Sequence, residues 1–350
     1  MGFGKLLGMA VGALALAGIA VTAEAQVSPQ RLQEIYKMSP EQMAATGAWT
    51  RSNYDRMLMY VNSIKDPKIR AMVADMVTNP RSTVFNQPAH KNAFRFSPAA
   101  GGPGHHFYPG GLAVHAVENI EISLGWSDAL AKVHGTDNTN RDMIIAALVL
   151  HDWAKVWYLW DEATAAVKRP DWFPEYWGGA DGIAKWKWMG GHGAIVYAEL
   201  MKRGAPDSLV VATAAAHFDA FWEVDKASGK EGLNAALAEA AKLAQLPAIK
   251  VDPAKRMAEW FMIVYSDGSW SYSHYIAGQF SHNWVREVAQ GLGIDPKSPE
   301  ANKLANFVLT RVSDFKLYNL YQSAGFDAAV PKKLILEVLQ NSSAYEVPAG

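Results

Sequence analysis

The chain has no cysteine among its 350 residues. Disulfide bonds, thiolate metal sites, iron–sulfur clusters and cysteine nucleophiles are therefore excluded. The chain also lacks an excess of either charge, because 33 Lys and Arg stand against 34 Asp and Glu. No basic field is available to hold a phosphate backbone, so we expect no nucleic-acid partner. Any metal ion must be held by imidazole and carboxylate groups.

Two common signatures of enzymes are absent as well. The chain has neither a Walker-type glycine loop, which cradles phosphates, nor a Gly-x-Ser-x-Gly nucleophile elbow. The sequence therefore gives no support to a P-loop nucleotidase or to a serine hydrolase with an α/β fold.

The first 25 residues have the pattern of a signal peptide. Lys5 precedes an apolar run over residues 6–21, and Ala23 and Ala25 form a small-x-small cleavage site. We expect a mature chain that begins at Gln26 and is periplasmic or secreted. The run is short and interrupted by glycine, so we expect no stable membrane insertion after cleavage. The alternative is an uncleaved anchor.

Apolar residues at helical spacing dominate the rest of the chain, and no convincing run of alternating strand residues occurs. We therefore predict an all-α fold. Residues 26–104 are expected to form N-terminal helices followed by an irregular arm over 79–104. The later helices are predicted at 110–124, 143–150, 194–201, 209–216, 233–246, 257–265, 302–317 and 332–339.

Seven tryptophans fall between residues 153 and 188, mixed with proline and glycine. This composition indicates an insertion that packs on its own large rings. Two interpretations remain open. The rings hold an irregular loop together, or Trp153 and Trp188, at its two ends, form walls of a substrate pocket.

The segment over residues 144–155 carries the most informative polar residues. A wholly apolar helix ends in adjacent His151 and Asp152, and Lys155 follows three residues later. Burial of such a pair costs several kcal/mol unless the groups are paired or bind a metal. An Asp that only orients a neutral His is the structural alternative.

Other polar residues also punctuate apolar segments. His115 lies one turn into a helix that begins at a glycine pair, and His192 lies at another helix start. His217 ends an apolar helix, and Asp267 lies within one. Four His and two Asp on separate helices can converge on one or two divalent ions in a bundle core. Such ligands suit Mn, Fe, Zn, Ni or Co.

The ordered pattern resembles the HD superfamily of metal-dependent phosphohydrolases. Pro-Gly-Gly-Leu-x-x-His at 109–115 and Ala-Leu-x-Leu-His-Asp-x-x-Lys at 147–155 are similar to its local signatures. The resemblance implies a helical HD domain over 105–285 with the Trp-rich insertion 153–188, and C-terminal helices over 286–350 that pack on this core. It implies a first metal bound by His115, His151 and Asp267, a second bound by His192 and His217, and Asp152 as the bridge. Lys155 is then a catalytic-site cation for a small anionic substrate.

Some signatures of particular HD members are missing. The Gly-Tyr-Pro motif and paired His of the cyclic-dinucleotide phosphodiesterases do not occur, since His217 is followed by Phe218. The Glu-Asp pair of alarmone hydrolases is also missing after the His-Asp helix. We therefore expect neither of these activities.

Three functions remain open. The first is hydrolysis of a phosphoester by a metal-activated water, with Asp152 and Lys155 at its centre. The second is oxygenation at two irons, as in myo-inositol oxygenase, which the same ligand set resembles. The third is a non-catalytic metal-dependent binding or sensing domain. His106 is a further, weaker candidate for substrate binding, whereas we expect His274 to lie outside the site. The sequence does not specify an oligomeric state.

Overall fold

The computed structural model describes residues 27–84, 89, 91–100, 105–135, 139–161, 163–168, 170, 192–217, 224–225, 230–252, 255, 257–271 and 274–348. The predicted signal peptide and Trp172, Trp177, Trp186 and Trp188 lie outside these residues. The predicted all-α fold is confirmed. Strands in the described part of the chain are two short antiparallel pairs: β1 (Leu159–Trp160) with β2 (Val167–Lys168), and β3 (Val224–Asp225) with β4 (Lys230–Glu231).

The described part of the chain contains fourteen α-helices. They are α1 (Pro29–Lys37), α2 (Pro40–Thr46), α3 (Ala48–Ser63), α4 (Pro67–Thr78), α5 (Gly111–His134), α6 (Arg141–Leu150), α7 (His192–Lys202), α8 (Asp207–Ala215), α9 (Leu233–Ala244), α10 (Ala258–Gly268), α11 (His274–Gly291), α12 (Pro299–Leu309), α13 (Asp314–Ser323) and α14 (Ala329–Gln340). Short 3₁₀ segments are η1 (Ala93–Arg95), η2 (Trp153–Trp157), η6 (Ser269–Ser271) and η7 (Ser343–Tyr345). Among the described residues, no helix combines the length and apolar character that crossing a membrane requires.

Several helix starts follow local capping rules. Ser39 caps α2 in a reciprocal capping box with Gln42, and Asp66 accepts hydrogen bonds from two backbone N–H groups of α4. Proline occupies the first turn of both helices, where no intrahelical donor is lost. These local signals fix where the N-terminal helices begin.

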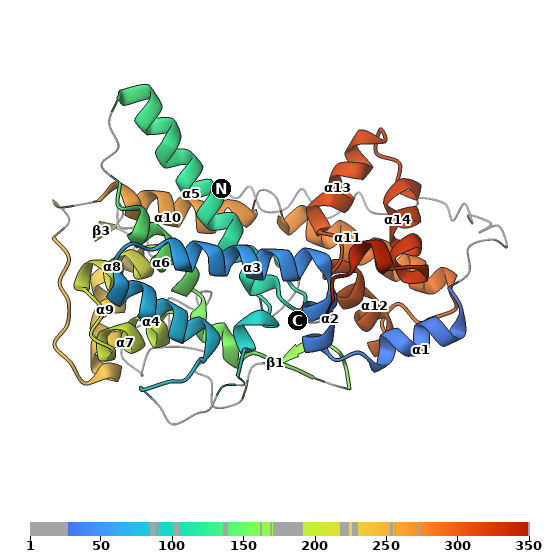
Figure 1. Cartoon of the computed structure of the whole chain (residues 1–350), viewed down its shortest axis with the longest axis horizontal. Helices are drawn as coiled ribbons and strands as arrows, with labels where there is room; N and C mark the ends of the chain where they lie inside the picture. The colour runs from blue at the N-terminus through green and yellow to red at the C-terminus, as the bar shows by residue number, and fades with distance from the viewer. Residues whose placement is uncertain are drawn as a thin grey trace, which may run out of the picture.

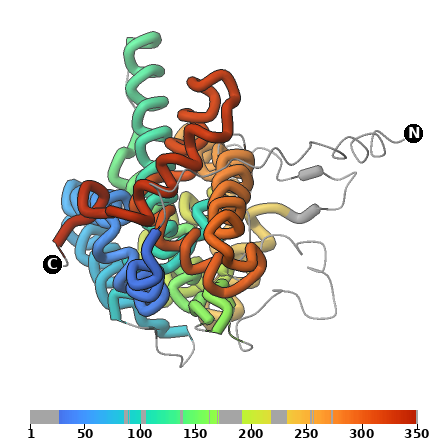
Figure 2. The backbone as a smooth tube through the Cα atoms, turned by 90° about the vertical axis from the view of Figure 1, so that its right-hand side faces the viewer, coloured from blue at the N-terminus to red at the C-terminus, as the bar shows by residue number. Residues whose placement is uncertain are grey.

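The buried apolar side chains form two hydrophobic clusters. The first joins α3 to α10 and contains the whole of α6 after its first two residues. The second joins α1, α2 and α11 to α14. In Figure 1 the first cluster's helices occupy the left half and the second cluster's the right half, while Figure 2 shows α11 to α14 from their own side. Helix α5 takes part in both, since Ala113 belongs to the first cluster and Val114 to the second.

Two details of the C-terminal part differ from the prediction. The expected single helix over 302–317 is wrong, because α12 ends at Leu309 and α13 begins at Asp314. The Ser313 side chain caps α13, and the carbonyl of Thr310 accepts the N–H of Thr50, so the interruption has its own partners. Helix α11 is not among the predicted helices, and it contains residues 285 and 286, where the sequence predicts the end of the HD domain.

Candidate metal centre

Five helices bring the predicted ligands to one place. His151 and Asp152 follow the buried end of α6, and His115 lies in the second turn of α5. His192 begins α7, His217 follows the end of α8, and Asp267 lies in the last turn of α10. We call these six residues the central cluster. Its members are buried or nearly so, although each carries a polar group.

Three donor atoms meet on one side of the central cluster. His115 Nε2 lies 3.2 Å from His151 Nε2, and the Oδ1 of Asp267 lies 3.0 and 3.1 Å from these two nitrogens. Asp152 turns its Oδ2 to the same side, at 3.6 Å from His115 and 3.5 Å from His151. The potential metal ligands on this side are therefore two imidazoles and two carboxylates.

The other oxygen of Asp152 faces a second pair of imidazoles. Its Oδ1 lies 3.1 Å from His192 Nε2 and 3.5 Å from His217 Nε2. Asp152 Oδ1 and His192 Nε2 are buried, yet neither makes a hydrogen bond despite their short separation. Buried polar atoms without partners are rare, and these two converge on a common point. The donor set fits a divalent transition-metal ion on each side of Asp152.

Neighbouring groups orient the imidazoles. His151 Nδ1 lies 2.8 Å from the Leu148 carbonyl, which selects the Nδ1–H tautomer and leaves Nε2 as the inward ligand. The hydroxyl of Tyr197 lies 3.0 Å from His217 Nδ1. Such partners typically fix both the tautomer and the ring angle of metal-binding histidines.

The electrostatics keep the carboxylates ionised. Burial alone would raise the pKa of Asp152, but Lys155 and His151 hold it well below its usual range. The pKa of Asp267 is also well below its usual range, because His151 and His115 outweigh its burial. Burial lowers the pKa of His192 to about 4, so this imidazole is neutral at neutral pH. Ionised carboxylates and neutral imidazoles are the states that bind metals.

Lys155 lies beside the central cluster, as predicted, but it is buried and already has partners. Its Nζ lies 2.5 Å from Asp152 Oδ2 and 2.5 Å from the Ala99 carbonyl. The ammonium group therefore acts first on Asp152.

The weaker predicted substrate contacts lie elsewhere. Trp153 is fully buried, donates its indole N–H to the Met76 carbonyl and packs on Trp157, so its ring is part of the first hydrophobic cluster. The side chain of His106 is buried and lies 3.1 Å from Glu118 rather than among the six ligands, so contact of His106 with a substrate stays a prediction. Trp188 lies outside the described residues.

A second group of titratable residues lies behind His115, and the sequence did not predict it. Glu118 Oε2 lies 3.1 Å from His106 Nε2 and 2.8 Å from His274 Nε2. His274 Nδ1 lies 3.0 Å from Asp314 Oδ1. We call His106, Glu118 and His274 the junction cluster, with Asp314 behind it. The ring centroid of His106 lies 4.1 Å from that of His274 and 5.4 Å from that of His115, so His274 lies outside the central cluster and is connected to it through His106.

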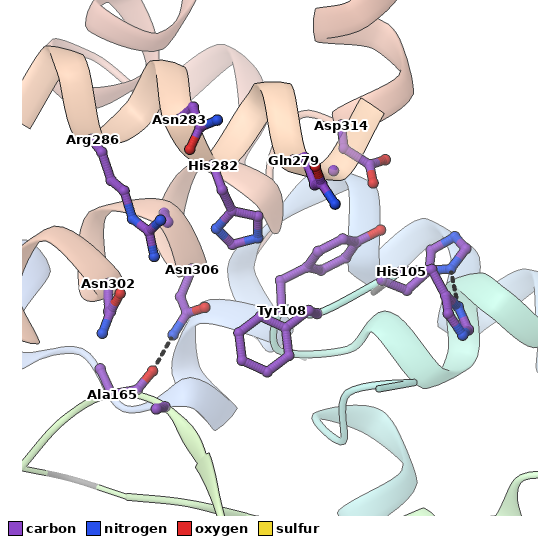
Figure 3. Close-up of a pocket in the computed structure, with 15 residues that line it drawn as sticks. His105, Tyr108, Ala165, Gln279, His282, Asn283, Arg286, Asn302, Asn306 and Asp314 are labelled. Atoms are coloured by element: carbon purple, nitrogen blue, oxygen red, sulfur yellow. Dashed lines mark hydrogen bonds between the residues drawn. The ribbon is translucent and has the colours of Figure 1, made fainter. Parts of the chain in front are cut away.

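A pocket of about 380 Å³ borders the junction cluster. In Figure 3, His282 and Arg286 extend from α11 toward Asn302 and Asn306, and Asn306 donates to the Ala165 carbonyl at 3.0 Å. His106 and Asp314 also line it. Its walls come from α11, α12, the start of α13, the loop before α5 and the turn before β2, and no residue of the central cluster lines it.

Comparison with known proteins gives a partial relationship. The chain is 34% identical over 98 residues to the dihydroneopterin 2',3'-cyclic phosphate phosphodiesterase of Methanocaldococcus jannaschii. The match covers 28% of this chain and 39% of that protein. No protein-family model and no solved structure matches the chain. The chain is thus similar to a phosphodiesterase over part of its length.

Proposed function

We propose that the chain is an exported, metal-dependent phosphodiesterase of the HD superfamily that hydrolyses a small anionic phosphoester. One observation carries the proposal. Asp152 divides its two oxygens between His115 and His151 on one side and His192 and His217 on the other. Two adjacent sites that share a carboxylate suit two-metal hydrolysis of phosphate esters.

The similarity to a phosphodiesterase supports the reaction class. That relative acts on a cyclic phosphodiester, as its name states. Because the match covers 39% of the relative, its substrate does not carry over, and the proposal stops at a phosphodiester of small size. The near-balanced charge of the whole chain favours a small substrate over a nucleic-acid polymer.

The chain's own residues would hold and orient the reacting groups. His115, His151 and Asp267 would bind one divalent ion, His192 and His217 another, and Asp152 both. Bound divalent ions supply Lewis acidity, which makes water a stronger nucleophile at neutral pH and offsets charge on the phosphoryl oxygens. Tyr197 and the Leu148 carbonyl keep the imidazoles aimed inward.

Lys155 takes a positioning role in this proposal. Its ammonium group contacts Asp152 Oδ2 and is held in place by the Ala99 carbonyl. The contact with Asp152 favours its ionised form, and the contact with Ala99 holds the ammonium group where it meets Oδ2. A charge-assisted hydrogen bond of this kind is stronger than a neutral one.

The direct test is hydrolysis of bis(p-nitrophenyl) phosphate by the full chain loaded with Mn²⁺, Zn²⁺ or Fe²⁺. We expect turnover that a chelator abolishes and that Asp267→Asn removes, with Asp128→Asn as the matched control. Asp128 is an exposed residue of α5 that pairs with Arg141. Metal loading without hydrolysis of any phosphoester would contradict the proposal.

The same samples separate the alternatives. Oxygen consumption by the iron form with a diol or phosphonate would favour an oxygenase. Metal binding with neither reaction would favour a binding or sensing domain. For export, N-terminal sequencing of protein recovered from outside the cytoplasm should begin at Gln26, and an intact Met1 on such protein would contradict the cleavage prediction.

A further inference from the structure

The junction cluster has the composition and spacing of a second kind of metal site. His106, Glu118 and His274 each offer one ligand atom, and these atoms lie within 4.8 Å of one another. Two of the separations are 3.1 and 2.8 Å. Ligand atoms that bind one ion at about 2.0–2.2 Å lie about 3.0 Å apart at right angles and about 3.4 Å apart in tetrahedral geometry. The spacing therefore matches ligands around a single ion.

His274 pairs with Glu118 and Asp314, so a cluster held by ion pairs alone is the competing explanation. The unpaired nitrogen of His106 argues against it. His106 Nε2 is buried and makes no hydrogen bond, although Glu118 Oε2 lies 3.1 Å away. The imidazole is therefore not aimed at the carboxylate in the way that a hydrogen-bonded pair requires. An unpaired ring nitrogen and a carboxylate oxygen that converge on one point are typical of metal ligands.

The groups behind the junction cluster select the correct tautomers. Asp314 Oδ1 lies 3.0 Å from His274 Nδ1 and accepts its N–H, which leaves Nε2 as the ligand atom. His106 Nδ1 lies 3.2 Å from His105 Nδ1, and a hydrogen bond donated by His106 leaves its Nε2 free in the same way. A carboxylate that accepts from the outer nitrogen is the usual second partner of a metal-binding histidine.

The backbone of the loop is held in an unusual conformation at this point. His106 has a φ of 47°, which is uncommon for a residue with a side chain. A Cβ on Gly111 would lie 1.9 Å from the His106 carbonyl oxygen, so the loop closes tightly over the start of α5. Backbone conformations of this cost, about 1–3 kcal/mol, concentrate at functional sites.

The position in the fold suggests what such an ion does. His106 and Glu118 come from the loop before α5 and from α5, whereas His274 begins α11 and Asp314 begins α13. Helix α5 packs mainly in the first hydrophobic cluster, with Val114 in the second, and α11 and α13 belong to the second. Glu118 keeps 26% of its side chain exposed, which leaves a route for an ion to enter.

We propose that His106, Glu118 and His274 bind a divalent transition-metal ion such as Zn²⁺, additional to any in the central cluster, and that this ion ties the two hydrophobic clusters together. Its ligand set is two imidazoles and one carboxylate, oriented by His105 and Asp314.

Zinc content after loading and gel filtration tests the proposal, measured by mass spectrometry on the full chain. Glu118→Gln should lose one zinc per chain relative to the unmodified protein. Glu121→Gln is the matched control, since Glu121 lies one turn further along α5 and pairs with Arg56. Asp314→Asn should keep all the ligands but weaken zinc binding at this site by about 10–100-fold. Equal zinc content in the unmodified, Glu118→Gln and His274→Gln proteins would overturn the proposal.

Two further measurements keep the result interpretable. Asp152→Asn should lose central-cluster ions and keep the ion that depends on Glu118, so failure of the proposed function and failure of this inference are distinguishable. If the variants do not fold, zinc-edge anomalous diffraction from crystals of the unmodified chain decides. Density bounded by the three ligand atoms supports the site, and its absence at full zinc loading contradicts it.

Discussion

The central cluster and the junction cluster use the same side chains in different settings. The central cluster gathers one or two residues from each of five helices, and Asp152 stands between two pairs of histidines. The junction cluster has one carboxylate between two histidines and a second carboxylate behind them. The central cluster lies inside the first hydrophobic cluster, and the junction cluster lies where the two hydrophobic clusters meet. We infer that the first arrangement serves a reaction and the second serves the assembly of the fold.

The largest loss of activity should follow the substitution of a ligand in the central cluster. His115→Gln should reduce hydrolysis of bis(p-nitrophenyl) phosphate by more than about 100-fold, because even outer partners of metal ligands contribute 10–100-fold. His134→Gln, at the exposed end of the same helix, should leave hydrolysis unchanged. Comparable rates in the two variants would show that His115 has no role in hydrolysis. They would contradict the assignment of the reaction to the central cluster.

An outer partner of the central cluster should have a smaller effect. Tyr197→Phe removes the hydroxyl that lies 3.0 Å from His217 Nδ1. We expect metal affinity or kcat/KM to fall by about 10–100-fold while the fold persists. Tyr275→Phe, at an exposed position of α11, is the control. Unchanged kinetics and metal affinity would show that the ring of His217 is fixed by packing alone.

Glu118→Gln should affect stability more than rate. We expect kcat/KM to change by less than about 10-fold, since Glu118 belongs to neither side of Asp152, while the rise in Tm on adding zinc becomes smaller. Glu121→Gln should keep the full rise. A loss of activity as large as that of His115→Gln, with Tm unchanged, would place the junction cluster in the reaction and contradict the comparison.

The smallest expected effect is the pH dependence of the stability that His274 contributes in the metal-free protein. Burial alone would lower the pKa of His274, but Asp314 and Glu118 raise it from 6.5 to about 10. A raised His pKa gives stability that is complete below the unfolded pKa and is lost as pH rises through the folded pKa. The unmodified protein should therefore have a higher Tm than His274→Gln. This difference in Tm should be largest below pH 6.5 and disappear toward pH 10. A constant excess over this range would contradict the ion pairs.

Much of the fold could be predicted because long apolar segments predict buried helices. The predicted helices over 143–150 and 209–216 correspond closely to α6 and α8. The interruption between α12 and α13 could not be seen in the apolar pattern, because it depends on Ser313 as a cap and on a contact with Thr50 from another helix. Helix α11 was missed although Ala277, Ser281 and Trp284 follow a helical spacing.

The two clusters also differ in how well the sequence predicts them. Each central ligand interrupts or ends an apolar segment, so its local surroundings already mark it as a buried polar group. Glu118 lies within a long helix and has the sequence context of a surface carboxylate, and Asp314 follows a serine cap as many helix-starting acids do. Their convergence depends on how α11 and α13 pack beside α5, which no local pattern encodes.

The central claim is that Asp152 bridges two metal sites. It is tested most directly by the number of divalent ions per chain in the unmodified and Asp152→Asn proteins, determined on the samples used for phosphodiester hydrolysis. We predict that the substitution, which keeps the volume of the side chain and removes its charge, abolishes both hydrolysis and the ions held by the central cluster. Full metal content together with undiminished hydrolysis in Asp152→Asn would contradict the account.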